Sequence, residues 1–113
     1  MEDSQLMKGI LEGCVLEIIH RGETYGYEIL SVLEESGFEN LGEGTLYPLL
    51  TRLDRGGYIT CRRQKSPLGP VREYYRITPE GESRLESFRE QYRKITAATE
   101  QVLKREPEQV EEQ

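Results

Sequence analysis

The sequence predicts a mostly helical α+β protein in which three short helices precede a β-hairpin and a long final helix. Three observations lead to this prediction. Apolar residues recur at helical spacing in four segments, two alternating segments flank the stretch "SPLGP", and the last apolar series is too long for a small domain to cover. Hydrophobic residues make up 35% of the 113 residues and charged residues 32%, which suits one modest core.

The first two helices are predicted from apolar spacing and from the residues that punctuate it. Apolar residues at i, i+3, i+4 and i+7 from Met7 to Ile19 predict a first helix that ends near Arg21–Gly22. Thr24 is the expected cap of a second helix over "YGYEILSVLEESG", and Gly37 is its expected end. The inward residues of this second helix are expected to be Leu30 and Leu33 with either Tyr25 or Ile29.

The third helix is predicted from a leucine stripe that contains a proline. If Thr45 or a residue just before it is the cap, Pro48 falls in or just past the first turn. The first N–H groups of a helix have no internal partner, so a proline there costs little. Two glycines at 56 and 57 end the helix, whose stripe is Leu46, Leu49, Leu50 and Leu53.

The hairpin is predicted from the alternating segments "YITCRRQK" and "VREYYRIT". Ile59 and Cys61 share one face, and Tyr75 and Ile77 are expected to oppose them. The other face and the tip then carry Arg62, Arg72, Tyr74 and Arg76.

The last helix is predicted to begin with Thr78 as its cap and Pro79 at its first position. Residues 79–106 would form a helix of about 42 Å at roughly 1.5 Å per residue, which is longer than the preceding domain can cover. We therefore expect a second chain to cover part of its heptad-like seam, although the seam could also fold back on its own domain. The predicted dimer-interface residues are Leu85, Phe88, Tyr92, Ile95, Thr99 and Val102.

Charge is distributed unevenly along the chain. Residues 1–43 contain 2 basic and 10 acidic side chains, and residues 79–113 contain 6 basic and 9 acidic side chains. Residues 44–78 contain 7 basic and only 2 acidic side chains, and the whole chain has a net charge of −6. Such a chain should repel nucleic acid except where the basic middle third faces it.

Several classes of protein are excluded by what the sequence lacks. No apolar run reaches the roughly 18 residues of a membrane span, the polar N-terminus does not look like a signal peptide, and Cys14 and Cys61 do not form a disulfide framework. We expect a reduced, cytoplasmic protein with no membrane partner. No catalytic motif, cofactor loop or metal-ligand set occurs, so no enzyme activity, cofactor or metal is expected. Cys14 is expected in the core and His20 in a structural role.

Three helices followed by a hairpin is the layout of a winged helix-turn-helix, whose third helix enters the DNA major groove and whose hairpin, the wing, touches the neighbouring backbone. Tyr47 could instead be an ordinary half-buried tyrosine, and the arginines could be a solvated face or keep an edge hairpin soluble. The predicted DNA-binding residues are Gly44, Thr45, Tyr47, Pro48, Thr51, Arg52 and Arg55 of the helix and Arg62, Arg63, Lys65, Arg72 and Tyr74 of the wing.

Five segments resemble one family. "GTLYPLLTRLDRGGYI", "GPVREYYRIT" and "TPEG" resemble the PadR-like winged helix transcriptional regulators, and "MKGILEGCVLEII" and "TYGYEI" resemble their opening helices. The resemblance spans residues 6 to about 90, and the single C-terminal helix is similar to the compact branch. It implies a dimer, usually a repressor, that small aromatic or drug-like effectors release from DNA in many cases. Two departures are Glu73, where the family often has a basic residue, and the absence of tryptophan, which leaves Phe88 and Tyr92 as the candidate effector pocket.

Together these observations predict a dimeric, sequence-specific DNA-binding regulator, a repressor relieved by a small molecule, acting on an inverted-repeat operator in double-stranded DNA. Residues 1–78 are expected to bind DNA, residues 79–106 to dimerise, and residues 107–113 to form a flexible tail. Two alternatives stay open: a winged-helix protein-interaction adaptor, and a small-molecule sensor without DNA binding. Glu73 could weaken phosphate affinity or point away from DNA.

Overall fold

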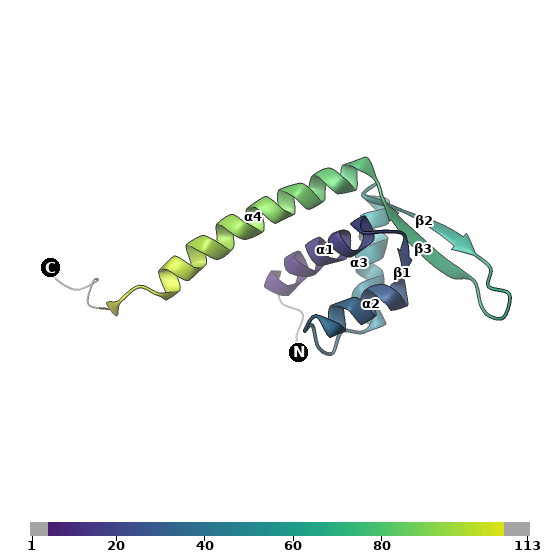
Figure 1. The fold of residues 1–113 in the computed structure, drawn as a ribbon, viewed down its shortest axis with the longest axis horizontal. Coiled ribbons are helices and arrows are strands. Elements are labelled where there is room, and N and C mark those ends of the chain that lie inside the picture. The colour runs from purple at the N-terminus through teal and green to yellow at the C-terminus, as the bar shows by residue number, and fades with distance from the viewer. Residues whose placement is uncertain (1–4, 108–113) are drawn as a thin grey trace.

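The computed structural model describes residues 5–107, which form four helices and a three-stranded antiparallel sheet (Figure 1). The predicted α+β, winged-helix fold with a long C-terminal helix is confirmed. Most of the expected tail, residues 108–113, lies outside the described residues. The elements are α1 (Gln5–His20), β1 (Thr24–Tyr25), α2 (Gly26–Glu35), α3 (Glu43–Arg55), β2 (Ile59–Gln64), β3 (Arg72–Ile77) and α4 (Pro79–Leu103).

The molecule is elongated because α4 projects beyond the other elements. Its extents are 72 × 30 × 20 Å and its radius of gyration is 17.9 Å, against about 13 Å for a compact chain of this length. Helices α1 to α3 and the sheet gather at one end, and α4 passes along α1 before it leaves them (Figure 1). The end of α4 therefore has no neighbour among the described residues.

The core is built mainly from α1 and the α3 stripe. All four leucines of the α3 stripe are buried, as predicted. Helix α1 is buried on a wider arc than its apolar spacing indicated, because Leu16 is also fully buried and the ring of Phe88 from α4 lies against Gly13. Cys14 and Cys61 pack against this core, and burial raises the pKa of both thiols.

The start of α2 differs from the prediction. Thr24 does not cap the helix: it lies in the short strand β1, is buried, and pairs with Tyr75 of β3. Its hydroxyl donates to the carboxylate of Glu28, and Tyr25 occupies the cap position without a side-chain hydrogen bond. Pairing with a strand 50 residues away outweighs the local capping preference. The end at Gly37 is confirmed by its positive φ of 119°.

Helix α3 begins earlier than predicted. Its cap is Gly42, so Thr45 is the third helical residue and Pro48 the sixth. Pro48 therefore lies beyond the first turn, and the N–H that it lacks would have reached the carbonyl of Gly44. The proline thus lies just past the first turn, one of the two expected placements, and removes one hydrogen bond from the helix. The helix ends at Gly56, and Gly57 follows with a φ of 82°.

The hairpin and the start of α4 follow the prediction. Strand β2 pairs with β3 so that Ile59 faces Ile77 and Cys61 faces Tyr75. Thr78 caps α4 by accepting a 3.0 Å hydrogen bond from the N–H of Gly81. The helix ends at Leu103 rather than at residue 106, which makes it about 38 Å long.

Candidate nucleic-acid interface

The outer side of α3 presents a tyrosine whose position depends on a glycine of α2. Tyr47 is 38% exposed, and its ring lies across Gly26, where an added Cβ would come within 2.3 Å of the phenol oxygen. Burial, assisted by the carboxylates of Glu43 and Glu73, raises the pKa of the Tyr47 phenol. The hydroxyl therefore keeps its proton at neutral pH and can donate it to a phosphate oxygen.

Two cations of α3 are free to meet a ligand. Arg52 and Arg55 are exposed, and neither side chain forms a hydrogen bond or an ion pair with any residue between 5 and 107. Between them and Tyr47, the hydroxyl of Thr51 donates to the Tyr47 carbonyl at 2.9 Å. Gly44 and Pro48 are also exposed, and Thr45 is half-buried. This side of α3 is therefore positive and uncovered.

A groove of about 450 Å³ separates α3 from the wing. Tyr27, at the start of α2, lines it and is 70% exposed, an unusual position for a large aromatic residue that only needs packing. Tyr27 is not among the residues predicted to bind DNA, although the aromatic-rich "TYGY" at a helix start was a usable sign. The groove is lined by Tyr25, Gly26, Tyr27, Tyr47, Arg63, Val71, Arg72 and Glu73.

Arg62 is exposed, but its guanidinium is bound to a carboxylate of the same chain. Its Nε and Nη2 atoms donate to the Glu23 carboxylate at 2.7 and 3.1 Å, and Arg76 lies 3.5 Å from the same group. The hydrogen bonds from Arg62, followed by the charges of Arg62 and Arg76, lower the pKa of Glu23. Arg62 thus ties the wing to the segment between α1 and β1, and its predicted contact with DNA stays a prediction.

Two more predicted wing contacts take part in a stack on the outer face of the sheet. The Arg62 guanidinium lies 4.9 Å from the centre of the Tyr74 ring, and that ring meets Tyr25 edge-on at 5.6 Å. Arg72 lies 4.2 Å over Tyr25. These cation–π contacts fix the direction of the wing. Tyr74 is half-buried in them, whereas Lys65 stays exposed without a partner among the described residues.

Glu73 faces the groove. It lies on the same side of β3 as Tyr75, accepts that tyrosine's hydroxyl at 3.1 Å, and is 3.3 Å from Nε of Arg63. Burial, assisted by Glu73, raises the pKa of Tyr75. Of the two possibilities left open by the sequence, the structure places this carboxylate within the candidate interface, beside an arginine that a phosphate would otherwise bind.

The seam on α4 divides into a buried start and an uncovered remainder. Leu85 is 1% exposed within a single chain and belongs to the core of its own domain, so its assignment to a dimer interface is wrong. Phe88 is half-buried and stacks on Tyr92 at 5.9 Å. Tyr92, Ile95, Thr99 and Val102 are exposed. Tyr92, Ile95 and Thr99 border a largely apolar groove of about 430 Å³ together with the exposed Leu6 of α1.

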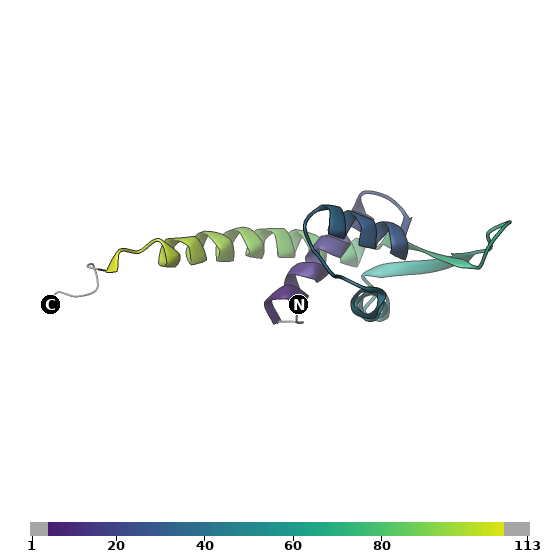
Figure 2. The same ribbon diagram turned by 90° about the horizontal axis from the view of Figure 1, so that it is seen from below.

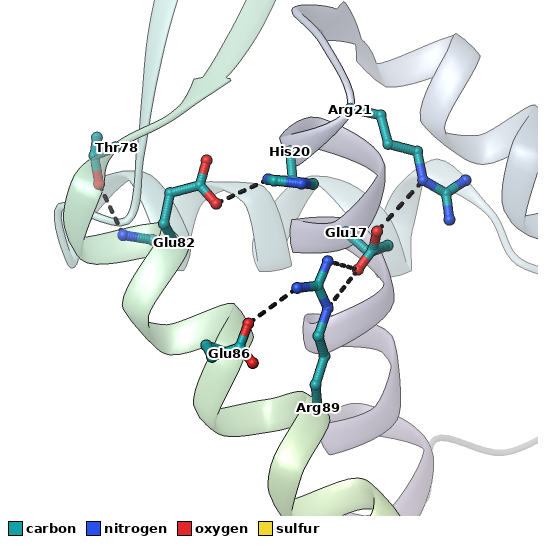
Figure 3. A network of polar contacts seen from close by, with 8 residues as sticks. Glu17, His20, Arg21, Thr78, Glu82, Glu86 and Arg89 are labelled. Atoms are coloured by element: carbon teal, nitrogen blue, oxygen red, sulfur yellow. Dashed lines mark hydrogen bonds and ion pairs between the residues drawn. The ribbon is translucent and has the colours of Figure 1, made fainter.

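Ion pairs join α1 to α4 where the helices run side by side (Figure 3). Arg89 binds Glu17 at 2.7 Å and Glu86 at 3.0 Å, and His20 lies 2.8 Å from Glu82. Partial burial opposes ionisation of Glu17, but the hydrogen bonds and charge of Arg89 outweigh it and lower its pKa. A further pair joins Arg84 to Glu12. The contact of His20 with Glu82 agrees with the structural role expected for it, and the pairs link α4 to α1.

Comparisons with known proteins place this geometry in a family. Residues 15–87 match the family model described as transcriptional regulator PadR-like family. A crystal structure of a Streptococcus transcriptional regulator is 41% identical over 88% of this chain and 98% of that chain, with a TM-score of 0.80. A PadR-like transcriptional regulator from Bacillus cereus is also 41% identical, over 91% of this chain and 100% of that chain, with a TM-score of 0.80.

A third structure, of Bacillus subtilis PadR in complex with operator DNA, is 27% identical. The similarity covers 70% of this chain and 46% of that chain, with a TM-score of 0.64. In the described part of this chain, no helix is long and apolar enough to cross a membrane, and no three metal-ligating side chains cluster.

Proposed function

We propose that this chain, which belongs to the PadR-like family of transcriptional regulators, binds operator DNA through α3 and the wing. The observation that carries the proposal is the outer side of α3. There Arg52 and Arg55 have no partner among residues 5–107 and lie beside a half-exposed tyrosine, in a chain of net charge −6. Tyr47 is assigned to a phosphate, sugar or thymine methyl, and Arg55 to base edges or phosphate. Arg63 and Lys65 are proposed as the wing contacts, because Lys65 has no partner among residues 5–107 and Arg63, 76% exposed, has only the Glu73 pair at the groove.

The DNA-bound form is proposed to be a homodimer. Residues 1–78 bind DNA and residues 79–106 pair with a second copy along Tyr92, Ile95 and Val102. An apolar series exposed to this extent on one helix is typical of an interface. Twofold symmetry would place two α3 helices in successive major grooves roughly 34 Å apart, so the operator is an inverted repeat.

A small aromatic effector is proposed to bind beside Phe88 and Tyr92 and to relieve repression. The support is the apolar groove of about 430 Å³ that the two stacked rings border. Such a ligand can release DNA only if it binds the two arrangements of the dimer with different affinity. The same groove keeps the small-molecule sensor as a second candidate function.

The test begins with selection of a binding site from random duplex DNA, followed by anisotropy titrations at several salt concentrations. We expect an inverted-repeat site whose affinity falls steeply as salt rises. The Tyr47→Ala and Arg52→Ala variants should weaken binding, while Arg93→Ala on α4 serves as the matched control. Failure of the wild-type protein to bind any duplex at low salt would favour the adaptor or the sensor.

A further inference from the structure

A second cleft lies on the other side of α3 from the wing. It has a volume of about 200 Å³ and is formed by the start of α1 and the first turns of α3. Figure 2 views α3 nearly end-on at the edge of the molecule, with the start of α1 on one side and the hairpin on the other. Leu11 and Leu49 form its buried floor, while Lys8, Gly44, Pro48 and Arg52 are exposed.

The cleft brings together two cations from separate helices. Lys8 is one of only two basic residues among the first 43, and the other, Arg21, lies 3.4 Å from Glu17. The usual partner of Lys8 would be Glu12, one turn further along α1, but Glu12 is bound to Arg84. Among the residues described, Lys8 forms no ion pair, and no carboxylate lines the cleft. Within the part of the chain that the structure describes, the cleft is therefore a net positive site in an acidic segment.

The position of this cleft relative to α3 suggests what it binds. A helix with its side chains is about 10–12 Å across and fills a major groove about 12 Å wide. A phosphate strand therefore borders each side of an inserted helix. The groove lined by Arg63 lies on one side of α3, and the Lys8–Arg52 cleft lies on the other.

We propose that the cleft between α1 and α3 binds a backbone phosphate of the DNA strand opposite the wing, with Lys8 and Arg52 as its two cationic contacts. This inference rests on the proposed function and deepens it. It assigns Arg52 to positioning on the backbone rather than to base recognition, and it adds to the interface a residue of α1, an element that winged-helix recognition by α3 and the wing does not require.

The test compares Lys8→Gln with Lys94→Gln, a control that removes another exposed lysine, from α4. The selected operator is titrated by anisotropy from low to high salt. Lys8→Gln should raise the Kd about threefold to tenfold and reduce the slope of log K against log salt by about 0.9, as expected for one lost phosphate contact. The ratio of affinities for the operator and a mutated operator should not change, since a phosphate contact carries no sequence information.

A second measurement locates the contact. Operators with a single uncharged methylphosphonate are scanned along both strands. One substitution flanking the α3 site, on the strand away from the wing, should weaken the wild-type protein but not Lys8→Gln. Wild-type Kd and salt slope in Lys8→Gln, together with tight operator binding by the wild type, would overturn this inference alone. No duplex binding by the wild type would overturn both this inference and the proposed function.

Discussion

At the scale of single residues, the candidate interface depends on Gly26, because a glycine has no side chain and leaves room for the Tyr47 ring. Gly26 lets the Tyr47 ring lie across the start of α2 with its hydroxyl at the groove. A methyl group there would come within 2.3 Å of the phenol oxygen and would force the ring to move. The glycine therefore acts through Tyr47 and not through DNA.

Gly26→Ala is expected to weaken operator binding about tenfold, equivalent to about 1.4 kcal/mol, without unfolding the protein. Anisotropy titration measures the change, with Gly9→Ala as the control because a Cβ there meets open space. The decisive comparison is made in the Tyr47→Ala background, where Gly26→Ala should cost no further affinity. An equal loss in both backgrounds would show that the glycine acts by another route.

Substitution of Glu73 is expected to strengthen operator binding, whereas Gly26→Ala is expected to weaken it. Its carboxylate repels phosphate and holds Arg63 at 3.3 Å, so Glu73→Gln should strengthen operator binding about threefold to tenfold and make it steeper in salt. Glu39→Gln, an exposed site between α2 and α3, is the control for the change in net charge. Unchanged affinity in Glu73→Gln would mean that Arg63 does not reach the backbone.

At the scale of elements, the ion pairs between α1 and α4 make stability depend on pH. The pKa of Glu17 is lowered by Arg89, so this pair stabilises the folded state above the ordinary carboxyl value near 4.5. That contribution is lost as the pH falls through the lower pKa of the folded state. The two side chains are 28% and 30% exposed, which limits the contribution to about 0.5–1 kcal/mol.

Glu17→Gln should therefore lower the free energy of unfolding by about 0.5–1 kcal/mol at pH 7 and make almost no difference near pH 3. Urea denaturation at fixed protein concentration across this range measures both quantities. Glu90→Gln is the control, because its pair with Lys94 is long, at 4.0 Å, and exposed. A difference between wild type and Glu17→Gln that stayed constant down to pH 3 would contradict the assignment.

At the scale of the whole molecule, the exposed part of α4 determines how two winged-helix domains are spaced. Ile95 is 63% exposed, lies on the seam and borders the apolar groove. Its burial by a second copy would place each α3 at a fixed distance from the other. The affinity for an inverted repeat then exceeds that of a single domain for a half-site by about 10²–10⁴.

Ile95→Glu should yield a folded monomer that has lost about a hundredfold or more in operator affinity but retains its affinity for a half-site. Sedimentation velocity gives the oligomeric state and anisotropy the binding. Arg93→Glu introduces the same side chain on a neighbouring exposed position and should remain dimeric. A wild-type protein that is monomeric at micromolar concentration would contradict the proposed assembly.

The four helices, the hairpin and most of their buried faces could be predicted from the sequence, whereas β1 could not. The leucines of α3, the cap at Thr78 and the inward faces of the hairpin were all predictable, because each depends on residues only a few positions apart. The basic middle third likewise identified α3 and the wing as the positive surface. Periodicity and caps are local properties, and a single sequence is sufficient to find them.

Contacts between distant elements determine which of the predicted residues remain available to bind DNA or a second chain. Thr24 pairs with a distant strand, although its local pattern also fits a helix cap. Arg62 binds Glu23, although its place on the wing also fits a DNA contact. Leu85 lies in the core of its own domain, although its place on the seam also fits a dimer interface. The Tyr47 ring contacts Gly26, and Glu12 pairs with Arg84 of α4 rather than with Lys8. Both contacts join residues 21 or more positions apart in the sequence. These contacts depend on the distances between elements, and those distances are fixed only in the folded tertiary structure.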